Sequence, residues 1–269
     1  MTHTPTDAPA LGLIGFGAFG RLAARHLSRH FRIFAYDPAV ADAPGIAFRS
    51  LGEAASCPVV VLAVPVCRLA ETVAAVAPHL RPGALVLDVG SVKEEPARVM
   101  RDGLPPDVDI VATHPMFGPQ SARDGIAGLK IAVCPLRGAS GRRVAAFLRR
   151  ALDLDVIVTT PEDHDRDAAL AQGLTHLIAQ VVVRMEPLPG RITTRSFDLL
   201  MEAVGMVRHD APEVFEAIVR ANPHAAEMRR RFAALATAML DPDEAVPAER
   251  FRTPDRDGPR PRATGARAA

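Results

Sequence analysis

A glycine-rich turn near the amino terminus constrains the fold of this chain more than any other feature. The turn consists of Gly15, Phe16, Gly17, Ala18, Phe19 and Gly20. It follows the apolar run 11–15 and precedes a segment, 18–29, whose apolar residues repeat with helical spacing. In such a unit the first glycine permits the turn, the second lets a pyrophosphate approach, and the third allows close packing. The helix N-terminus adds N–H donors, so the motif predicts a dinucleotide site.

Apolar runs alternate with helical segments over the next part of the chain. These runs lie at 32–37, 58–65, 84–90, 109–113, 130–135 and 155–160. They are rich in Val, Ile and Leu, and several lack polar alternation, which is typical of strands buried on both faces. Strands that alternate with helices predict an α/β fold with a Rossmann-type, doubly wound parallel sheet.

The pattern changes after the last of these runs. Residues 161–240 show only helical segments, so we expect a small all-helical domain that mediates dimerisation and closes the substrate site. Residues 241–269 contain five prolines and few large apolar side chains, and this tail is predicted to be disordered. The dinucleotide-binding domain accordingly spans residues 1–160.

Asp37 ends the second predicted strand, 17 residues after the last glycine of the turn. A carboxylate at this position binds ribose hydroxyls and repels a 2′-phosphate, and residues 38–41 supply no cation to hold one. We therefore expect NAD rather than NADP. Ala63, Val64 and Pro65 follow the third predicted strand, and this loop is expected to pass under the nicotinamide ribose.

Ser91 and His114 each follow a predicted strand. Because parallel strands bring their carboxyl ends to one edge of a sheet, the two side chains are expected to lie close together. A neutral histidine can accept a proton from a substrate hydroxyl, and a serine hydroxyl can hold either partner in place. A histidine that only caps a loop is an equally good interpretation of His114 from spacing alone.

Gln172, Thr175 and His176 form a polar spot on the apolar stripe of a predicted helix. A lone histidine on such a face is more often a core residue, but the three together favour a site. No comparable context surrounds His164 or His209, so both are expected at the surface.

The motifs GFGAFG, AYD, LAVP, DVGSVK, HPMFGP and QGLTH occur in this order over roughly residues 11–230. Together they resemble the prephenate/arogenate dehydrogenase family of tyrosine biosynthesis, and HPMFGPQSARDG is similar to the plant-type arogenate branch. The resemblance implies NAD-dependent oxidative decarboxylation of prephenate to 4-hydroxyphenylpyruvate or of arogenate to tyrosine. It also implies a nucleotide-binding domain followed by a helical dimerisation domain, hence a homodimer.

The resemblance assigns roles to the candidate residues. His114 would accept the proton of the ring hydroxyl as hydride leaves, and Ser91 would orient that hydroxyl and His114. The polar spot around His176 would contact the substrate from the helical domain. Lys93 would shape the loop after Ser91, or it is simply a structural or solvated lysine.

One position departs from the resemblance. Many bacterial members carry an arginine in the C-terminal helices that binds a substrate carboxylate, and here Met206 stands near that place. Arg208, or Arg191 or Arg195 from a dimer partner, could supply the cation instead. Asp124 could pair with the ammonium group that arogenate has and prephenate lacks, or it is an exposed loop residue, so the preferred substrate stays open.

Two other readings compete with this function. Another two-domain NAD(P)-dependent enzyme, such as a β-hydroxyacid dehydrogenase or an imine reductase, would use a helical lysine, but no lysine follows Lys130. A non-catalytic NAD-binding sensor would not need Ser91, His114 and His176 together.

Composition excludes several further classes. A net charge of +1 offers no footprint for nucleic acid, and the longest apolar run, 58–67, is too short to cross a membrane. The three cysteines and the histidines lack metal-ligand spacing, so no metal site is predicted. The amino terminus has no signal-peptide pattern, and we expect a cytoplasmic enzyme acting on a small molecule.

Overall fold

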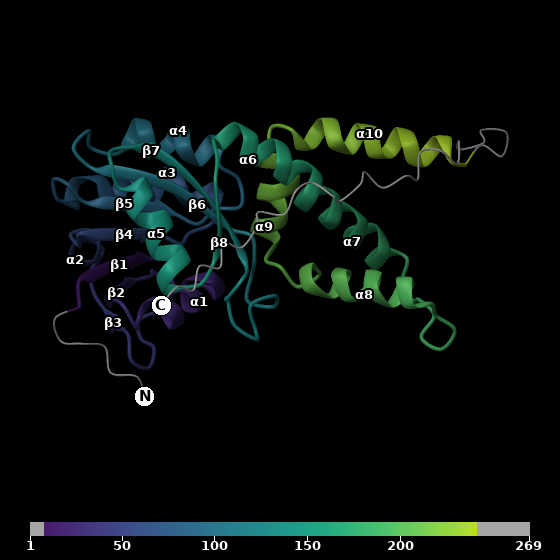
Figure 1. Ribbon diagram of the computed structural model, residues 1–269, viewed down its shortest axis with the longest axis horizontal. Helices are drawn as coiled ribbons and strands as arrows, with labels where there is room; N and C mark the ends of the chain where they lie inside the picture. The colour runs from purple at the N-terminus through teal and green to yellow at the C-terminus, as the bar shows by residue number, and fades with distance from the viewer. Residues whose placement is uncertain (1–7, 241–269) are drawn as a thin grey trace, which may run out of the picture. The chain divides into compact units, whose positions relative to one another are not determined.

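The computed structural model describes residues 8–240. The chain divides into two compact units, one ending at Arg229 and one beginning at Arg230. Within the first unit, eight strands form one sheet with the order β3-β2-β1-β4-β5-β6-β7-β8 (Figure 1). The strands are β1 (Ala10–Ile14), β2 (Arg32–Tyr36), β3 (Ala47–Phe48), β4 (Val59–Leu62), β5 (Leu85–Asp88), β6 (Asp109–Pro115), β7 (Lys130–Arg137) and β8 (Asp155–Val158).

The predicted doubly wound α/β sheet is confirmed, with a difference at one edge. Strands β1 to β6 pair in parallel, whereas β7 pairs with β6 in antiparallel fashion, with His114 opposite Ala132. β8 then pairs in parallel with β7. The reversal has a local cause: the described segment 116–129 between β6 and β7 contains turns and no helix. Without a crossover helix, the chain cannot return to begin a parallel strand.

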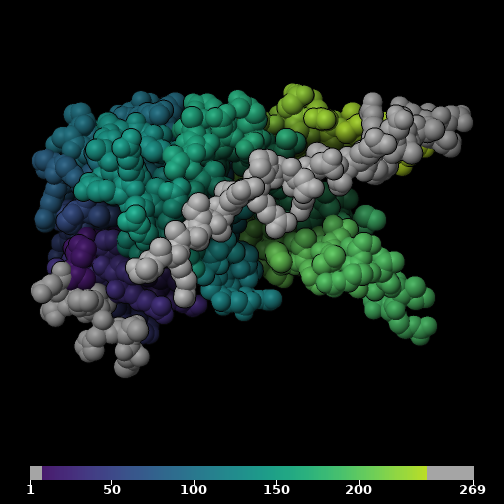
Figure 2. Space-filling view, in the orientation of Figure 1, coloured from purple at the N-terminus to yellow at the C-terminus, as the bar shows by residue number. Residues whose placement is uncertain are grey.

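Helices cover both faces of the sheet because the central strands are apolar on both sides. One face carries α2 (Leu51–Ala55), α3 (Leu69–Val76) and α4 (Glu94–Gly103), whose apolar residues join one core cluster with the strands. The other face carries α1 (Ala18–Leu27) and α5 (Gly141–Ala151). α5 lies over the last strands of the sheet on the side seen in Figures 1 and 2. Two 3₁₀ turns, Val66–Arg68 and Ala77–His79, flank α3.

The described chain after β8 is helical, as predicted. Its elements are α6 (Pro161–Ala168), a π-helical segment (Ala169–Gly173), α7 (Leu174–Arg184), α8 (Arg195–Val207), α9 (Pro212–Glu216), a second π segment (Ala217–Ala221) and α10 (Ala225–Ala238). The helical region begins after Thr160. The Thr160 side chain accepts a hydrogen bond from the Asp163 backbone N–H and thereby caps the amino end of α6. A domain boundary at residue 160 stays a proposal, and the predicted tail 241–269 lies outside the described residues. None of the described helices is long and apolar enough to span a membrane.

Candidate active site

The glycines of the first turn have distinct structural roles. Gly15 has φ +98°, and a Cβ there would lie 2.3 Å from the carbonyl oxygen of Ala63. A Cβ on Gly20 would lie 2.3 Å from the Gly15 carbonyl oxygen, whereas one on Gly17 would meet no atom within 4 Å. The first and third glycines are therefore required by packing, and the second leaves open space at the amino end of α1. No side chain caps that end of the helix, so its N–H groups suit an anion.

Asp37 lies in a pocket of about 520 Å³ beyond the end of β2. Its carboxylate accepts hydrogen bonds from the backbone N–H of Phe16 at 2.7 Å and of Ala39 at 2.8 Å. Arg49 lines the same pocket, although the sequence showed no cation near Asp37, because the chain returns to this place between β3 and α2. The lining consists of Tyr36, Asp37, Val40, Ala41, Phe48, Arg49, Ser50 and Glu53.

A second, larger cleft of about 690 Å³ brings most of the predicted site residues together. It extends from the glycine turn, past the loops that follow β4, β5 and β6, to the helices α7 and α9. The predicted residues in its lining are Gly17, Ala18, Phe19, Ala63, Val64, Pro65, Ser91, His114, Gln172, Thr175 and His176. Residues more than a hundred positions apart, such as Gly17 and His176, therefore face one space.

Two predicted substrate contacts lie elsewhere. The Asp124 side chain is 90% exposed and pairs with Arg123 at 3.3 Å. Arg208 pairs with Glu186 at 3.0 Å, and neither Asp124 nor Arg208 lines the cleft. Both assignments rested on proximity in sequence, and the loop and the helix end turn these side chains towards solvent.

The charged groups that do line the cleft were missed from the sequence. They are Asp210 and Glu213, which lie between α8 and α9 and at the start of α9. No lysine or arginine belongs to the lining among residues 8–240, and Met206, which stands near the position of the arginine in many bacterial members, lines the cleft. The cleft therefore presents carboxylates and histidines. His209 is exposed, as expected, and also belongs to the lining.

His114 lies next to the last residue of β6 and is buried, only 3% exposed. Burial holds the pKa of its imidazole well below the usual value, and nearby His164 and Lys93 lower it further. His114 is therefore neutral at physiological pH and able to accept a proton. The structure shows no hydrogen bond between Ser91 and His114 within its described residues, although both line the cleft.

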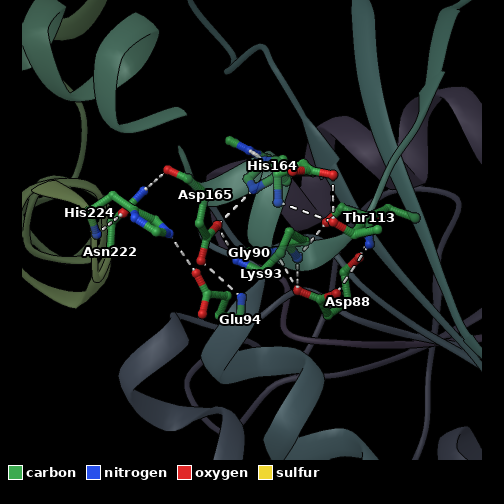
Figure 3. Close-up of polar contacts among 12 residues, drawn as sticks. Asp88, Gly90, Lys93, Glu94, Thr113, His164, Asp165, Asn222 and His224 are labelled. Carbon is green, nitrogen blue, oxygen red and sulfur yellow. Dashed lines mark hydrogen bonds and ion pairs between the residues drawn. The ribbon is translucent and has the colours of Figure 1, made fainter. Parts of the chain in front are cut away.

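His164 was expected at the surface but is 5% exposed and contacts His114 directly. The Nε2 atom of His164 lies 2.8 Å from Nδ1 of His114, and its Nδ1 lies 2.7 Å from Oδ1 of Asp165. The Asp165 carboxylate also accepts the backbone N–H groups of Lys93 at 2.7 Å and Glu94 at 2.9 Å (Figure 3). It thereby caps the amino end of α4, where the helix dipole favours a negative charge. Sequence offers one signal for this cluster, a His–Asp pair in the first turns of the helix after the last strand.

Lys93 is a buried structural lysine. Its Nζ forms an ion pair with Asp88 at the end of β5 and donates to the carbonyl of Thr113 at 2.7 Å. Thr113 immediately precedes His114, so this bond ties the loop that carries Ser91 to the strand that carries the histidine (Figure 3). Of the alternatives that the sequence left open for Lys93, the solvated one is wrong.

The helical side of the cleft contains Gln172, Thr175 and His176. Gln172 lies in the π segment, a helix irregularity that is frequent at functional sites, and its Oε1 is buried without a hydrogen-bond partner in the described structure. His176 is buried with Nε2 at 3.7 Å from Asp210, and burial lowers the pKa of His176. Burial likewise raises the pKa of Asp210. This wall of the cleft thus offers polar groups, such as the Gln172 amide oxygen, whose hydrogen bonds a bound molecule would complete.

Sequence relatives of the chain share one type of activity in their names. A family model described as prephenate dehydrogenase, nucleotide-binding domain, matches residues 39–145. Arogenate dehydrogenase 2, chloroplastic, of Arabidopsis thaliana is 31% identical over 247 residues, 85% of this chain and 68% of that protein. A probable arogenate/prephenate dehydrogenase of Methanocaldococcus jannaschii is 27% identical over 186 residues, 65% of this chain and 41% of that protein. The chain thus spans roughly two fifths to two thirds of the length of these relatives.

Solved structures of two dehydrogenases share the fold of this chain. Prephenate dehydrogenase from Aquifex aeolicus, in complex with hydroxyphenyl propionate and NAD⁺, has a TM-score of 0.66 at 19% identity, over 88% of this chain and 92% of that one. Synechocystis arogenate dehydrogenase has a TM-score of 0.60 at 18% identity, over 86% and 92%. These two likenesses establish the fold, and the Arabidopsis relative extends the likeness to the sequence. The chain belongs to the prephenate and arogenate dehydrogenase family.

Proposed function

We propose that this protein is an NAD-dependent dehydrogenase that oxidatively decarboxylates arogenate or prephenate in tyrosine biosynthesis. One observation carries the proposal: a buried, neutral His114 lines the same cleft as the glycine turn. A proton acceptor and a nucleotide-binding turn that face one space are what hydride abstraction from a hydroxyl-bearing carbon requires.

The cofactor would be held by the turn and by Asp37. Gly17 leaves room for the pyrophosphate, the open amino end of α1 supplies donors, and the Asp37 carboxylate suits the ribose hydroxyls. Bound NAD would supply the hydride acceptor. The loop from Ala63 to Pro65, which also lines the cleft, would lie beside the nicotinamide end.

The chain's own groups would then move one proton. His114 accepts the proton of the ring hydroxyl while the hydroxyl carbon becomes a carbonyl carbon and loses its hydride. The ring carboxylate departs as carbon dioxide, and its bonding electrons complete an aromatic ring that carries a phenolate oxygen. The His114 imidazolium returns its proton to that oxygen. Ser91, at the same edge of the sheet, would orient the hydroxyl group.

The charge of the cleft favours arogenate over prephenate. Asp210 and Glu213 line it, and no lysine or arginine does so in the described part of the chain. Arogenate carries an ammonium group that can pair with a carboxylate, whereas the side chain of prephenate carries only a carboxylate and a carbonyl. We therefore propose that Asp210 takes the role that the sequence suggested for Asp124.

The proposal is tested by NADH formation with arogenate and, separately, with prephenate. We expect turnover by the wild-type protein and a roughly 100- to 10,000-fold lower kcat in His114→Asn, with NAD affinity nearly unchanged. His30→Asn, which changes a histidine outside the cleft, is the matched control and should keep its rate. Nucleotide binding without turnover of either substrate would contradict the proposal.

A homodimer through the helical region is also proposed. In the first unit, apolar side chains of α7, the following loop and α8 are exposed, namely Val181, Met185, Ile192, Leu199 and Leu200. Apolar groups gathered in this way mark protein contact surfaces. A partner that covers them would also bring its own Arg191 or Arg195 towards the cleft, whose described lining contains no lysine or arginine.

A further inference from the structure

We infer that His164, held by Asp165, is a positioning residue that selects the tautomer of His114 in which Nε2 is free to accept the substrate proton. The inference rests on the proposed function for its catalytic meaning. The tautomer itself is a property of the protein without substrate.

The assignment begins at Asp165. Its carboxylate accepts backbone N–H groups at the amino end of α4, from Lys93 at 2.7 Å and Glu94 at 2.9 Å. Two backbone N–H donors suit the carboxylate form, which can only accept hydrogen bonds. The contact of 2.7 Å between Asp165 Oδ1 and His164 Nδ1 therefore requires a hydrogen on Nδ1 of His164.

The second step fixes the nitrogen that faces His114. In its neutral form, His164 carries its one ring hydrogen on Nδ1, so its Nε2 presents a lone pair. This lone pair lies 2.8 Å from Nδ1 of His114. His114 must then donate from Nδ1, and its own Nε2 keeps the lone pair that proton abstraction needs.

Burial makes the selection strong. His114 is 3% and His164 5% exposed, so no bulk water competes for the nitrogen atoms that face each other. In the opposite tautomer of His114, two lone pairs would face each other, and two buried acceptors would lose their hydrogen bond.

Neighbouring segments hold the cluster in place. The side-chain amide of Asn222 donates to the Asp165 carbonyl at 2.8 Å, and His224 lies 2.9 Å from Glu94 (Figure 3). Lys93, which forms an ion pair with Asp88, also lies close enough to His114 to lower its pKa. The helix after β8 thus delivers a hydrogen-bond acceptor to a strand end fifty residues earlier in the chain.

Two substitutions separate positioning from packing. His164→Phe fills a similar space without an acceptor, and His164→Gln restores an acceptor through its amide oxygen. We expect kcat to fall about 100-fold in the Phe variant, with KM for NAD nearly unchanged, and to recover about tenfold or more in the Gln variant.

Nitrogen NMR of the ¹⁵N-histidine-labelled protein provides a readout independent of turnover. We expect His114 to carry its hydrogen on Nδ1 in the wild type and in His164→Gln, and on Nε2 in His164→Phe. A wild-type His114 protonated on Nε2, or Phe and Gln variants with equal kcat and equal tautomers, would overturn the inference. An inactive wild type with the expected tautomer would instead contradict only the proposed function.

Discussion

At the scale of single residues, the substrate side of the cleft depends on the ionisation of a few groups. Asp210 is half-buried and its pKa is raised by burial, while His176 beside it has a pKa lowered by burial. Each shift disfavours the charged form, so an oppositely charged ligand group beside either residue would stabilise that residue's charged form. An ammonium group would do so for Asp210.

Asp210→Asn should lower the ratio of kcat/KM for arogenate to kcat/KM for prephenate by roughly tenfold or more, because a charged hydrogen bond is worth about 1.5–3 kcal/mol. The ratio is measured with both substrates under the same conditions. Asp124→Asn changes an exposed aspartate outside the cleft and serves as the control, with an expected ratio equal to that of the wild type. An unchanged ratio in Asp210→Asn would show that another group recognises the ammonium.

At the scale of elements, a buried ion pair holds the loop after β5 in place. Lys93, on the loop between β5 and α4, reaches Asp88 at the end of β5 and the carbonyl of Thr113 on β6. Three elements therefore meet at one side chain, two residues after Ser91 in the chain and bonded to the residue before His114. Removal of one partner would leave the other charge buried and unpaired.

Lys93→Met should lower the free energy of unfolding by about 3–5 kcal/mol, measured by urea denaturation. Lys130→Met is the matched control, because Lys130 is the other lysine of the chain and lies exposed at the start of β7. Its unfolding free energy should stay within about 0.5 kcal/mol of the wild type. A loss in Lys93→Met no larger than in the control would mean that Asp88 is hydrated without its partner.

The sequence predicts the elements far better than the contacts between them. The glycine turn, Asp37 and the strand-end positions of Ser91 and His114 follow from local pattern, since a parallel sheet collects strand ends at one edge. His164 escaped notice because its role depends on a contact across fifty residues, which periodicity does not encode. The antiparallel β7 and the acid Asp210 were missed for the same reason: loop paths decide them, and no local rule gives a path.

At the scale of the whole molecule, the proposed dimer would account both for the exposed apolar surface and for the lack of a lysine or arginine in the described lining of the cleft. Leu199 and Leu200 of α8 are 48% and 40% exposed, and the preceding loop carries Arg191. Wild-type protein should elute with about twice the chain mass by light scattering, and Leu199→Glu should shift it towards the monomer with a lower kcat/KM. Ile157→Glu, at an exposed apolar position of β8, should leave both mass and kcat/KM unchanged. A monomeric Leu199→Glu variant with full kcat/KM would place every substrate contact within one chain, and the carboxylates of the substrate would then be held without any arginine from a partner.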